Sequence, residues 1–282
     1  METQENSGQI VLAATPIGNL SDASPRLVEL MKSADIVAAE DTRRFLHLAQ
    51  GLGVRVPGRL ISYHEHNETH RLTELLELVA GGATVLVVSD AGMPAVSDPG
   101  FKLVEAAVAA GVTVTAVPGP SAVLTALALS GLPTDRFTFE GFLPRKAGER
   151  AKRLEDLATE QRTMVFFEAP HRLDAMIRAL RDAFGGERPG AIARELTKMY
   201  EEVIRGPLDE LVVWAEGEVR GEIAVVIGGA PAGEPARAVD HVSQVQQLVS
   251  EGLRLKEAVA AVAEKERISK RELYTAVLEA RA

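Results

Sequence analysis

Short apolar runs alternate with amphipathic patterns along the first half of the chain. Five runs predict buried strands, at residues 10–14, 36–39, 60–63, 85–88 and 112–117. Helical spacing of apolar residues predicts helices after Ser24-Pro25, over 72–79 and after Asp98-Pro99. Strands that alternate with helices indicate a parallel sheet with both faces covered. The first half is therefore expected to be an α/β domain.

The second half keeps this character and then changes. Its strand candidates are residues 137–142, 164–167, 192–193 and 223–227, with helical patterns between them. A Gly/Pro-rich segment, 228–235, is typical of a linker. Beyond Arg237 the patterns are helical only, and 255–266 and 270–278, joined by a turn at 267–269, resemble a helix-turn-helix pair.

These patterns divide the chain into three parts. The turn at 133–135 marks the change between the two α/β units. The expected organisation is a first α/β domain at 10–133, a second at 134–229 and a small C-terminal helical domain at 237–282.

The amino-acid composition excludes several classes of function for this chain. The chain of 282 residues has no cysteine, which excludes disulfides, thiolate metal sites and a cysteine nucleophile and suits the cytoplasm. Its formal charge of −9 argues against non-specific coating of nucleic acid, so any RNA contact needs a local basic patch. The first nine residues lack a signal-peptide pattern, and no apolar run is long enough for a membrane helix.

The segment 89–100, Ser-Asp-Ala-Gly-Met-Pro-Ala-Val-Ser-Asp-Pro-Gly, follows the clearest strand and precedes a helix. It is longer than the usual strand-to-helix loop of roughly 2–6 residues. Ligands of open α/β sheets bind beyond the carboxyl ends of the strands, where such loops lie. We expect this loop to contact a ligand.

Two further loops follow strands in the first half. Val117-Pro118-Gly119-Pro120-Ser121-Ala122 leads into a helix of small residues, which suits either close ligand approach or tight helix packing. Residues 14–20 follow the first strand. Neither the dinucleotide fingerprint nor the P-loop pattern occurs, which argues against cofactors held through a pyrophosphate.

Polar clusters at strand ends leave several interpretations open. His64, His66 and His70 fit either a zinc site or a polar loop with Asn67 as helix cap. Residues 40–44 could form an ordinary ion cluster or the mouth of a polar site. A carboxylate, a histidine and an arginine occur together at 168–172, and charged residues occur at 194–198. Such groups could act in acid–base catalysis or bind phosphate.

In combination, these motifs resemble the ribosomal RNA small subunit methyltransferase I family of the tetrapyrrole methylase superfamily. The resemblance runs from about Ile10 to Gly228. The motifs that define it are residues 14–20, 39–43, 62–67, 89–100, 117–122, 142–145, 168–172 and 193–198.

The resemblance implies a fold, a cofactor and a reaction. It implies two α/β domains with S-adenosylmethionine in the cleft between them, and a homodimer. It implies 2′-O-methylation of a cytidine in the decoding region of 16S ribosomal RNA, with the small ribosomal subunit as partner. Met93 departs from the threonine expected in many relatives. By position, the implied cofactor contacts are Pro16, Leu20, Gly92, Met93, Pro94, Val96, Ser121, Ala122, Phe167, Ala193 and Ile223.

The proposed reaction needs alignment, a proton acceptor and phosphate contacts. The sequence does not choose among the candidate bases or orienting groups, which are Glu40, Asp41, His64, Glu168 and His171. Guanidinium groups bind phosphate well. The candidate RNA contacts are Arg43, Arg44, Arg145, Lys146, Arg172, Arg194 and Lys198.

Three other functions remain open at this stage. The same fold could methylate a tetrapyrrole such as a corrin precursor, although the low aromatic content and the helical C-terminus favour RNA. The chain could be a non-catalytic ribosome-assembly module, or a hydrolase built on the three histidines. The segment from Arg237 has eight basic and seven acidic residues, a net charge of +1, so its contact with RNA stays undecided.

Overall fold

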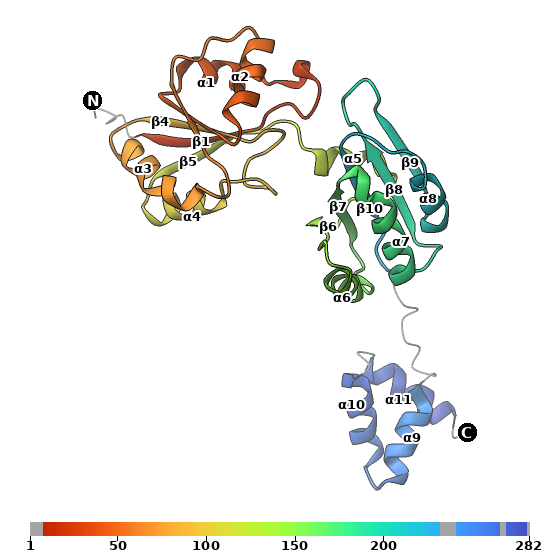
Figure 1. The fold of residues 1–282 in the computed structure, drawn as a ribbon. Coiled ribbons are helices and arrows are strands. Elements are labelled where there is room, and N and C mark those ends of the chain that lie inside the picture. The colour runs from red at the N-terminus through yellow and green to blue at the C-terminus, as the bar shows by residue number, and fades with distance from the viewer. Residues whose placement is uncertain (1–7, 232–240, 266–268, 281–282) are drawn as a thin grey trace. The chain divides into compact units, whose positions relative to one another are not determined.

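The computed structural model describes residues 8–231, 241–265 and 269–280. The chain separates into two compact units, the first ending at Gly228 and the second beginning at Gly229 (Figure 1). Arg237, the second half of the predicted linker, and Arg267 and Ile268 of the predicted turn lie outside the described residues.

The first sheet contains β1 (Gln9–Ala13), β2 (Ile36–Ala39), β3 (Arg59–Ser62), β4 (Thr84–Val88) and β5 (Thr113–Val117). Its order is β3-β2-β4-β1-β5, and every pair is parallel. The five strands and the parallel sheet predicted from the apolar runs are thus confirmed. Because all strands run the same way, their carboxyl ends meet at one edge, where the loops after β1, β2, β4 and β5 gather.

Helices cover both faces of this sheet (Figure 1). Alternate residues of the central strands face opposite cores, and Leu86 packs with α1 (Pro25–Ser33) and α2 (Thr42–Gly51). Val85 and Val87 pack with α3 (Glu68–Ala80) and α4 (Phe101–Ala109). The Ser24 Oγ accepts a hydrogen bond from the amide of Leu27, 3.1 Å away, which caps α1 as its Ser-Pro start predicts.

Asn67 is the N-cap residue of α3, as one interpretation of the sequence had it, but its side chain makes no capping hydrogen bond. Its Oδ1 instead accepts from the amide of His64 at 2.9 Å, and its Nδ2 donates to the carbonyl of Ser62 at 3.1 Å. The Asn67 side chain therefore stabilises the turn before α3. The backbone groups of Ser62 and His64 occupy the side-chain atoms that could otherwise cap the helix.

The second sheet is mixed. It contains β6 (Phe137–Phe142), β7 (Thr163–Glu168), β8 (Pro189–Arg194), β9 (Glu202–Pro207) and β10 (Ile223–Ile227) in the order β6-β7-β10-β8-β9. Only β6 and β7 are parallel; the other neighbours are antiparallel. The sequence prediction missed β9, an edge strand without a buried residue. Its sequence, Glu-Val-Ile-Arg-Gly-Pro, lacks the continuous apolar run of a central strand.

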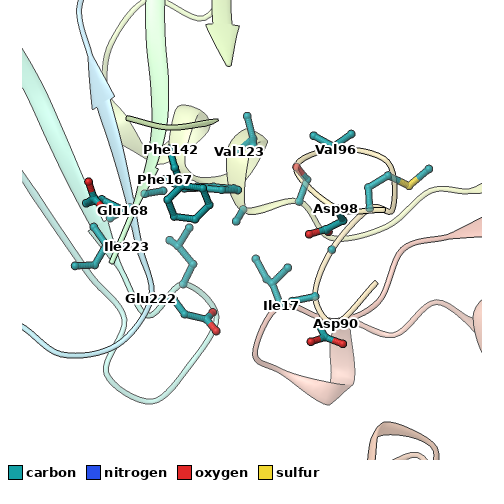
Figure 2. A pocket seen from close by; sticks show the side chains of 18 of the residues that line it. Ile17, Asp90, Val96, Asp98, Val123, Phe142, Phe167, Glu168, Glu222 and Ile223 are labelled. Atoms are coloured by element: carbon teal, nitrogen blue, oxygen red, sulfur yellow. The ribbon is translucent and has the colours of Figure 1, made fainter. Parts of the chain in front are cut away.

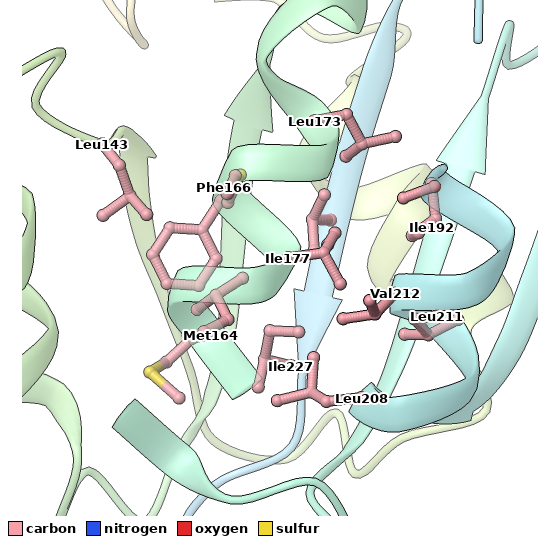
Figure 3. Packing of buried hydrophobic residues seen from close by; sticks show 14 of the residues in the cluster. Leu143, Met164, Phe166, Leu173, Ile177, Ile192, Leu208, Leu211, Val212 and Ile227 are labelled. Carbon is pink, nitrogen blue, oxygen red and sulfur yellow. The ribbon is translucent and has the colours of Figure 1, made fainter. Parts of the chain in front are cut away.

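One face of the second sheet carries α6 (Ala147–Leu157), α7 (Leu173–Phe184) and α8 (Leu208–Ala215). Figure 3 shows this core, in which Phe166 and Ile227 pack against Ile177 and Leu211. The opposite face is covered by α5 (Ala122–Ser130) through Val123, Ala126 and Leu127. This helix precedes the turn at 133–135 yet packs on the second sheet, and the three-domain division remains our proposal.

The C-terminal unit is a three-helix cluster of α9 (Val242–Ser250), α10 (Leu255–Lys265) and α11 (Lys270–Glu279). Val245, Val262 and Leu273 meet in its own apolar core. The Ser269 Oγ accepts from the amide of Glu272 and caps α11. The two helices predicted at 255–266 and 270–278 are confirmed as far as the described residues reach, since Glu266 lies outside them. Within the described residues, no helix is both long and apolar enough to span a membrane.

Candidate functional site

A cavity of about 530 Å³ lies within the first unit, between the strand-end loops of the first sheet and the second sheet (Figure 2). This volume falls within the roughly 300–1,000 Å³ typical of small-molecule sites. Its lining is mostly apolar with a few carboxylates, the usual composition of a site that binds an organic ligand. The residues that line it are Ile17, Glu40, Arg44, 90–93, Val96, Asp98, 121–123, Phe142, 167–170, Ala193, Leu196 and 221–224.

The loop 89–100 after β4 forms one wall. A two-residue bridge fastens it to the loop after β1: the Thr15 amide donates to the Gly92 carbonyl at 2.9 Å, and the Gly92 amide donates back at 3.1 Å. Gly92 has φ +83°, which glycine adopts without a side-chain penalty. Ala95 and Ser97 also have positive φ, at 67° and 64°. Such backbone strain in non-glycine residues is held by surrounding contacts and is common at ligand sites.

A buried carboxylate beneath this loop fixes its far end. The side chain of Glu68 is only 7% exposed. Its Oε1 accepts from the Tyr63 hydroxyl at 2.9 Å and from the Gly100 amide at 3.0 Å. Burial and the hydrogen bond to Glu68 raise the pKa of Tyr63, so the hydroxyl stays protonated. Glu68 thus ties the loop to α3 and β3.

The start of α5 forms the floor of the cavity, between the loops of the first sheet and the strand ends of the second sheet. The Ser121 Oγ accepts from the amide of Leu124 at 3.4 Å, so Ser121 caps the helix. Gly119 lies so close to the first strand that a Cβ there would stand 2.9 Å from the Ala14 Cβ. Ser121 and Ala122 both line the cavity. The loop 117–122 therefore serves close packing and cavity lining together, the two alternatives that its sequence left open.

Strand ends of the second sheet form the opposite, apolar wall. Phe167 on β7 packs edge-to-face with Phe142, with ring centroids 5.8 Å apart. Ala224 pairs with Phe167 in the sheet and with Ala193 on the other side. Ile223 completes this wall. Aromatic and aliphatic side chains here give a planar or apolar ligand group a contact surface.

Carboxylates gather on the first-half side. The Glu40 Oε2 accepts from the Asp90 amide at 3.2 Å, and the Arg44 guanidinium lies 3.2 Å from the Asp90 carboxylate. Burial raises the pKa of Glu40, an effect that the Asp90 amide partly offsets. Burial and the nearby Glu40 raise the pKa of Asp98 to about 7. Three carboxylates beside one arginine make this side attractive to a cation.

The structure brings together most of the sequence-predicted cofactor residues. Those that line the cavity are Gly92, Met93, Val96, Ser121, Ala122, Phe167, Ala193 and Ile223. Pro16, Leu20 and Pro94 do not line it, although each neighbours a loop that does. Leu20 lies in a short 3₁₀ helix (η1, Leu20–Asp22) and is 44% exposed. The cofactor role of all eleven residues remains a prediction.

Only two of the five candidate bases line the cavity, Glu40 and Glu168. Asp41 caps α2 instead, and hydrogen bonds from Arg43 hold the pKa of its carboxyl well below the usual range. The Nε2 atom of His64 lies 3.3 Å from the side-chain Nδ2 atom of Asn67, in the turn before α3. His171 faces a second cavity.

Glu168 has a partner of its own. Its Oε1 accepts from the Ala169 amide at 2.8 Å, and its Oε2 lies 3.3 Å from the Arg172 guanidinium. The side chain is 1% exposed. The buried Oε2 makes no hydrogen bond, so its polar contact among the described residues is the ion pair with Arg172.

The predicted RNA contacts are spread over several surfaces. Arg43 pairs with Asp41, Lys146 with Glu149 and Arg194 with Glu202. Lys198 binds both Glu195 and Glu222. Arg44 lines the first cavity, whereas Arg145 and Arg172 line the second.

Sequence reasoning missed several lining residues. Asp90 and Asp98 stand in the loop that the sequence singled out, but nothing in the sequence shows that their side chains turn inward. The repeated Ser-Asp pair at 89–90 and 97–98 is the one signal that could have found them. Ile17, Phe142, Leu196 and Glu222 also line the cavity, and only tertiary structure places them there.

A zinc site on the three histidines finds no support in the described part of the chain. His64 and His66 face each other edge-on, with ring centroids 5.9 Å apart. No group of three or more histidine, aspartate or glutamate side chains among the described residues is arranged to hold a metal ion. A metal-dependent hydrolase therefore has no observation in its favour.

Known proteins resemble this chain over most of its length. The family model of the tetrapyrrole (corrin/porphyrin) methylases matches residues 9–212, which include nearly all of the cavity lining. The chain belongs to the tetrapyrrole methylase family. This membership confirms the superfamily inferred from the sequence, and the structure confirms the fold class of two α/β sheets with helices and a helical C-terminal appendage.

Curated relatives within the tetrapyrrole methylase family match nearly the whole chain. A protein of Mycobacterium tuberculosis named "Ribosomal RNA small subunit methyltransferase I" is 52% identical, covering 98% of this chain and 96% of its own. A protein of the same name from Pseudomonas aeruginosa is 43% identical over 97% of this chain and 98% of its own.

Solved structures share the fold at lower identity. The methyltransferase CobJ has a TM-score of 0.60 at 24% identity, covering 79% of this chain and 95% of its own. Uroporphyrin-III C-methyltransferase from Thermus thermophilus, complexed with S-adenosyl homocysteine, has a TM-score of 0.56 at 21% identity, covering 78% and 97%.

Proposed function

We propose that this protein transfers a methyl group from S-adenosylmethionine to the 2′-oxygen of a cytidine in the decoding region of 16S ribosomal RNA. The observation that carries the proposal is how much of this chain each kind of relative matches. Relatives named for ribosomal RNA methylation match 98% of the chain, whereas the solved CobJ and uroporphyrin methyltransferases leave about a fifth unmatched. The substrate is therefore the small ribosomal subunit rather than a tetrapyrrole, and the site of action is the cytoplasm.

The cavity of about 530 Å³ suits S-adenosylmethionine in size and in chemistry. Glu40, Asp90 and Asp98 supply negative charge for a cationic group. Phe142, Phe167 and Ile223 supply an apolar wall for an aromatic base. The loops at 92–96 and 121–122 supply backbone groups and small side chains.

When bound, S-adenosylmethionine supplies a methyl group on a positively charged sulfur, already activated for transfer to oxygen. The protein must align the acceptor, a contribution worth up to about 7–11 kcal/mol in ideal cases. Glu40 would accept the proton of the acceptor 2′-hydroxyl, so that this oxygen can take up the methyl group. It suits this role because its Oε1 has no hydrogen-bond partner among the described residues and its pKa is raised.

The remaining predicted contacts serve RNA. Arg44 lines the cavity, where it pairs with Asp90, and would contact the acceptor strand there. More peripheral cations, Arg43, Lys146, Arg194 and Lys198, meet phosphates farther along the RNA and would exchange their surface carboxylate partners for them. The active form is a homodimer.

The deciding experiment measures methyl transfer from labelled S-adenosylmethionine to small ribosomal subunits that lack the modification. Free ribosomal RNA and a tetrapyrrole precursor serve as parallel acceptors. We expect label in the RNA of the subunit and resistance to alkaline cleavage at one ribose. Label in the tetrapyrrole alone would reject the RNA substrate. Cofactor binding without transfer to any acceptor would also reject the proposed reaction.

A further inference from the structure

A second cavity, of about 790 Å³, adjoins the first. It is formed by the end of β6 and the segment after it, by α6, and by the 3₁₀ turn η2 (Pro170–Arg172) that leads into α7. Phe142 and Ala169 line both cavities, so the two share a boundary. Its other lining residues are Leu143, Pro144, Arg145, Arg150, His171, Arg172 and Ala175.

The charge of this second cavity is one-sided. Arg145, Arg150 and Arg172 line it together with His171, and no carboxylate is among the described residues of its wall. The remainder of the wall is alanine, leucine, proline and phenylalanine. In a chain with a formal charge of −9, such a local concentration of cations calls for a functional explanation.

Two of these arginines have no acidic partner. Neither Arg145 nor Arg150 makes an ion pair with any residue in the described part of the chain. The Arg150 guanidinium donates only to the backbone carbonyl of Arg145, at 3.4 Å. Most other arginines around the site are paired with carboxylates, as Arg153 is with Glu140. The two side chains are thus available to an external anion.

The third arginine is held in place. Arg172 donates to the Leu143 carbonyl at 3.0 Å and lies 3.3 Å from the buried Glu168 carboxylate. Its side chain is 20% exposed. A fixed guanidinium beside two unpaired ones is a prepared arrangement for a phosphate, because guanidinium groups bind phosphate oxygens through paired hydrogen bonds.

Phe142 stands at the boundary and is 57% exposed. Its ring packs edge-on against Phe167, which leaves surface free for contact. Exposed aromatic rings stack on unpaired bases in single-stranded RNA. Because Phe142 lines both cavities, a base stacked on its free surface would lie at their shared boundary.

We propose that the second cavity binds a backbone phosphate of single-stranded RNA next to the acceptor ribose, through Arg145, Arg150 and Arg172. This proposal rests on the proposed function and names the part of the substrate that fixes the position of the ribose. It adds Arg150, which the sequence had not singled out, and it assigns Arg145 and Arg172 to one phosphate.

The test compares the full-length double variant Arg145→Gln, Arg150→Gln with the control Lys152→Gln. Lys152 lies on the same helix as Arg150, is exposed, and does not line the cavity. Arg172 is left unchanged because its loss would strand the buried Glu168. The probes are a fluorescein-labelled single-stranded oligoribonucleotide and purified small ribosomal subunits, each titrated over a range of salt concentrations.

We expect the double variant to bind the oligoribonucleotide at least tenfold more weakly at low salt. The slope of log affinity against log salt should fall by about 0.7 for each phosphate that the variant no longer neutralises. The control should stay within twofold of wild type, and the affinity for S-adenosylmethionine should be unchanged in both proteins.

The two proposals fail in different ways. Equal affinities and slopes for the double variant and the control would overturn the phosphate site, even if wild type methylates the subunit. Weaker RNA binding by the double variant would support the phosphate site, even if wild type transfers no methyl group to RNA. If the double variant loses only turnover of a carboxylate-bearing tetrapyrrole, the cavity binds carboxylates and the RNA proposal is wrong.

Discussion

Asp98 and Glu40 share the first-half wall of the cavity, and burial raises the pKa of each. Folding raises the pKa of Asp98 from 3.8 to about 7. The folded protein therefore keeps a proton that the unfolded chain loses between these values. The resulting contribution to stability is full below about pH 4 and is lost as pH rises through 7. Because Asp98 exchanges this proton near pH 7, its charge also responds to the charge of a ligand in the cavity.

Binding of S-adenosylmethionine should tighten as pH rises from 6 to 8. A cation in the cavity favours ionised Asp98, so binding releases its proton and is helped by higher pH. Asp98→Asn should flatten this dependence and weaken binding at pH 8. Calorimetric titration at several pH values measures it. S-adenosylhomocysteine, whose sulfur is neutral, is the control, and an equally steep dependence for it would contradict the charge argument.

Glu40→Gln should lower kcat by about 10²–10⁴-fold, the usual contribution of a general base. The affinity for S-adenosylmethionine should change only a few-fold, because the amide keeps an acceptor for the Asp90 amide. The comparison variant is Glu168→Gln, which alters the other candidate base at the cavity, a carboxylate that pairs with Arg172. Rapid-quench kinetics separates binding from transfer. A larger loss of kcat in the Glu168 variant would transfer the role of base to that residue.

At the scale of elements, the loop 89–100 depends on contacts from outside itself. The Thr15–Gly92 bridge holds its beginning, and Glu68 holds the Gly100 amide at its end. Between them Ala95 and Ser97 keep positive φ values. A loop with strained backbone and two fastened ends holds its cavity-facing side chains in one arrangement before any ligand arrives.

Glu68→Ala should destabilise the protein by about 1–3 kcal/mol for each hydrogen-bond donor left without a partner, the Tyr63 hydroxyl and the Gly100 amide. It should also weaken S-adenosylmethionine binding, since the loop loses its far anchor. Tyr63→Phe, which removes only the first of these bonds, should lower stability less and keep cofactor affinity. Denaturant unfolding and calorimetry measure the two effects. Unchanged cofactor affinity in Glu68→Ala would contradict the anchoring role.

The central strands β1, β2 and β4 of the first sheet could be predicted from sequence because they are buried on both faces and appear as continuous apolar runs. The Gly/Pro-rich loops after them marked the cavity wall for a related reason, since long loops at strand ends are unusual. The edge strand β9 gave no such run. The helix α5 is apolar on all sides, so its pattern could not show which sheet it covers.

The site itself was only partly predictable. The motifs identified the right loops, but the direction of each side chain depends on tertiary contacts. Asp98 points into the cavity, whereas Asp41, at the end of another strand, turns back to cap α2. His171 follows the cavity-lining Pro170 yet faces the second cavity. Neighbours in sequence therefore divide between two sites in a way that spacing alone does not reveal.

At the scale of the whole molecule, the two compact units have separate cores. All residues that line the first cavity lie between Ile17 and Ala224, within the first unit. The apolar core of α9, α10 and α11 is made of residues from Val242 onward. The lining of the first cavity and the apolar core of the C-terminal helices thus come from different units.

A chain that ends at Gly228 should bind S-adenosylmethionine within twofold of the full-length affinity, because it retains the whole lining of the first cavity. Isothermal titration on both chains measures this, with circular dichroism to verify that the shorter chain is folded. Parallel binding to small ribosomal subunits then reports what the three helices add. A folded shorter chain that fails to bind the cofactor would show that the C-terminal unit supports the site.

The place of β1 in the first sheet has a consequence for biosynthesis. This strand is made first but lies in the sheet between β4 and β5, the last two to be made. At roughly 5–20 residues per second, translation needs about 5–20 s to supply both neighbours. Until β4 is made the segment Gln9–Ala13 has neither of its final partners, and until β5 is made it has only one. Within this sheet, β1 is therefore the strand that waits longest for its neighbours while the chain is being made.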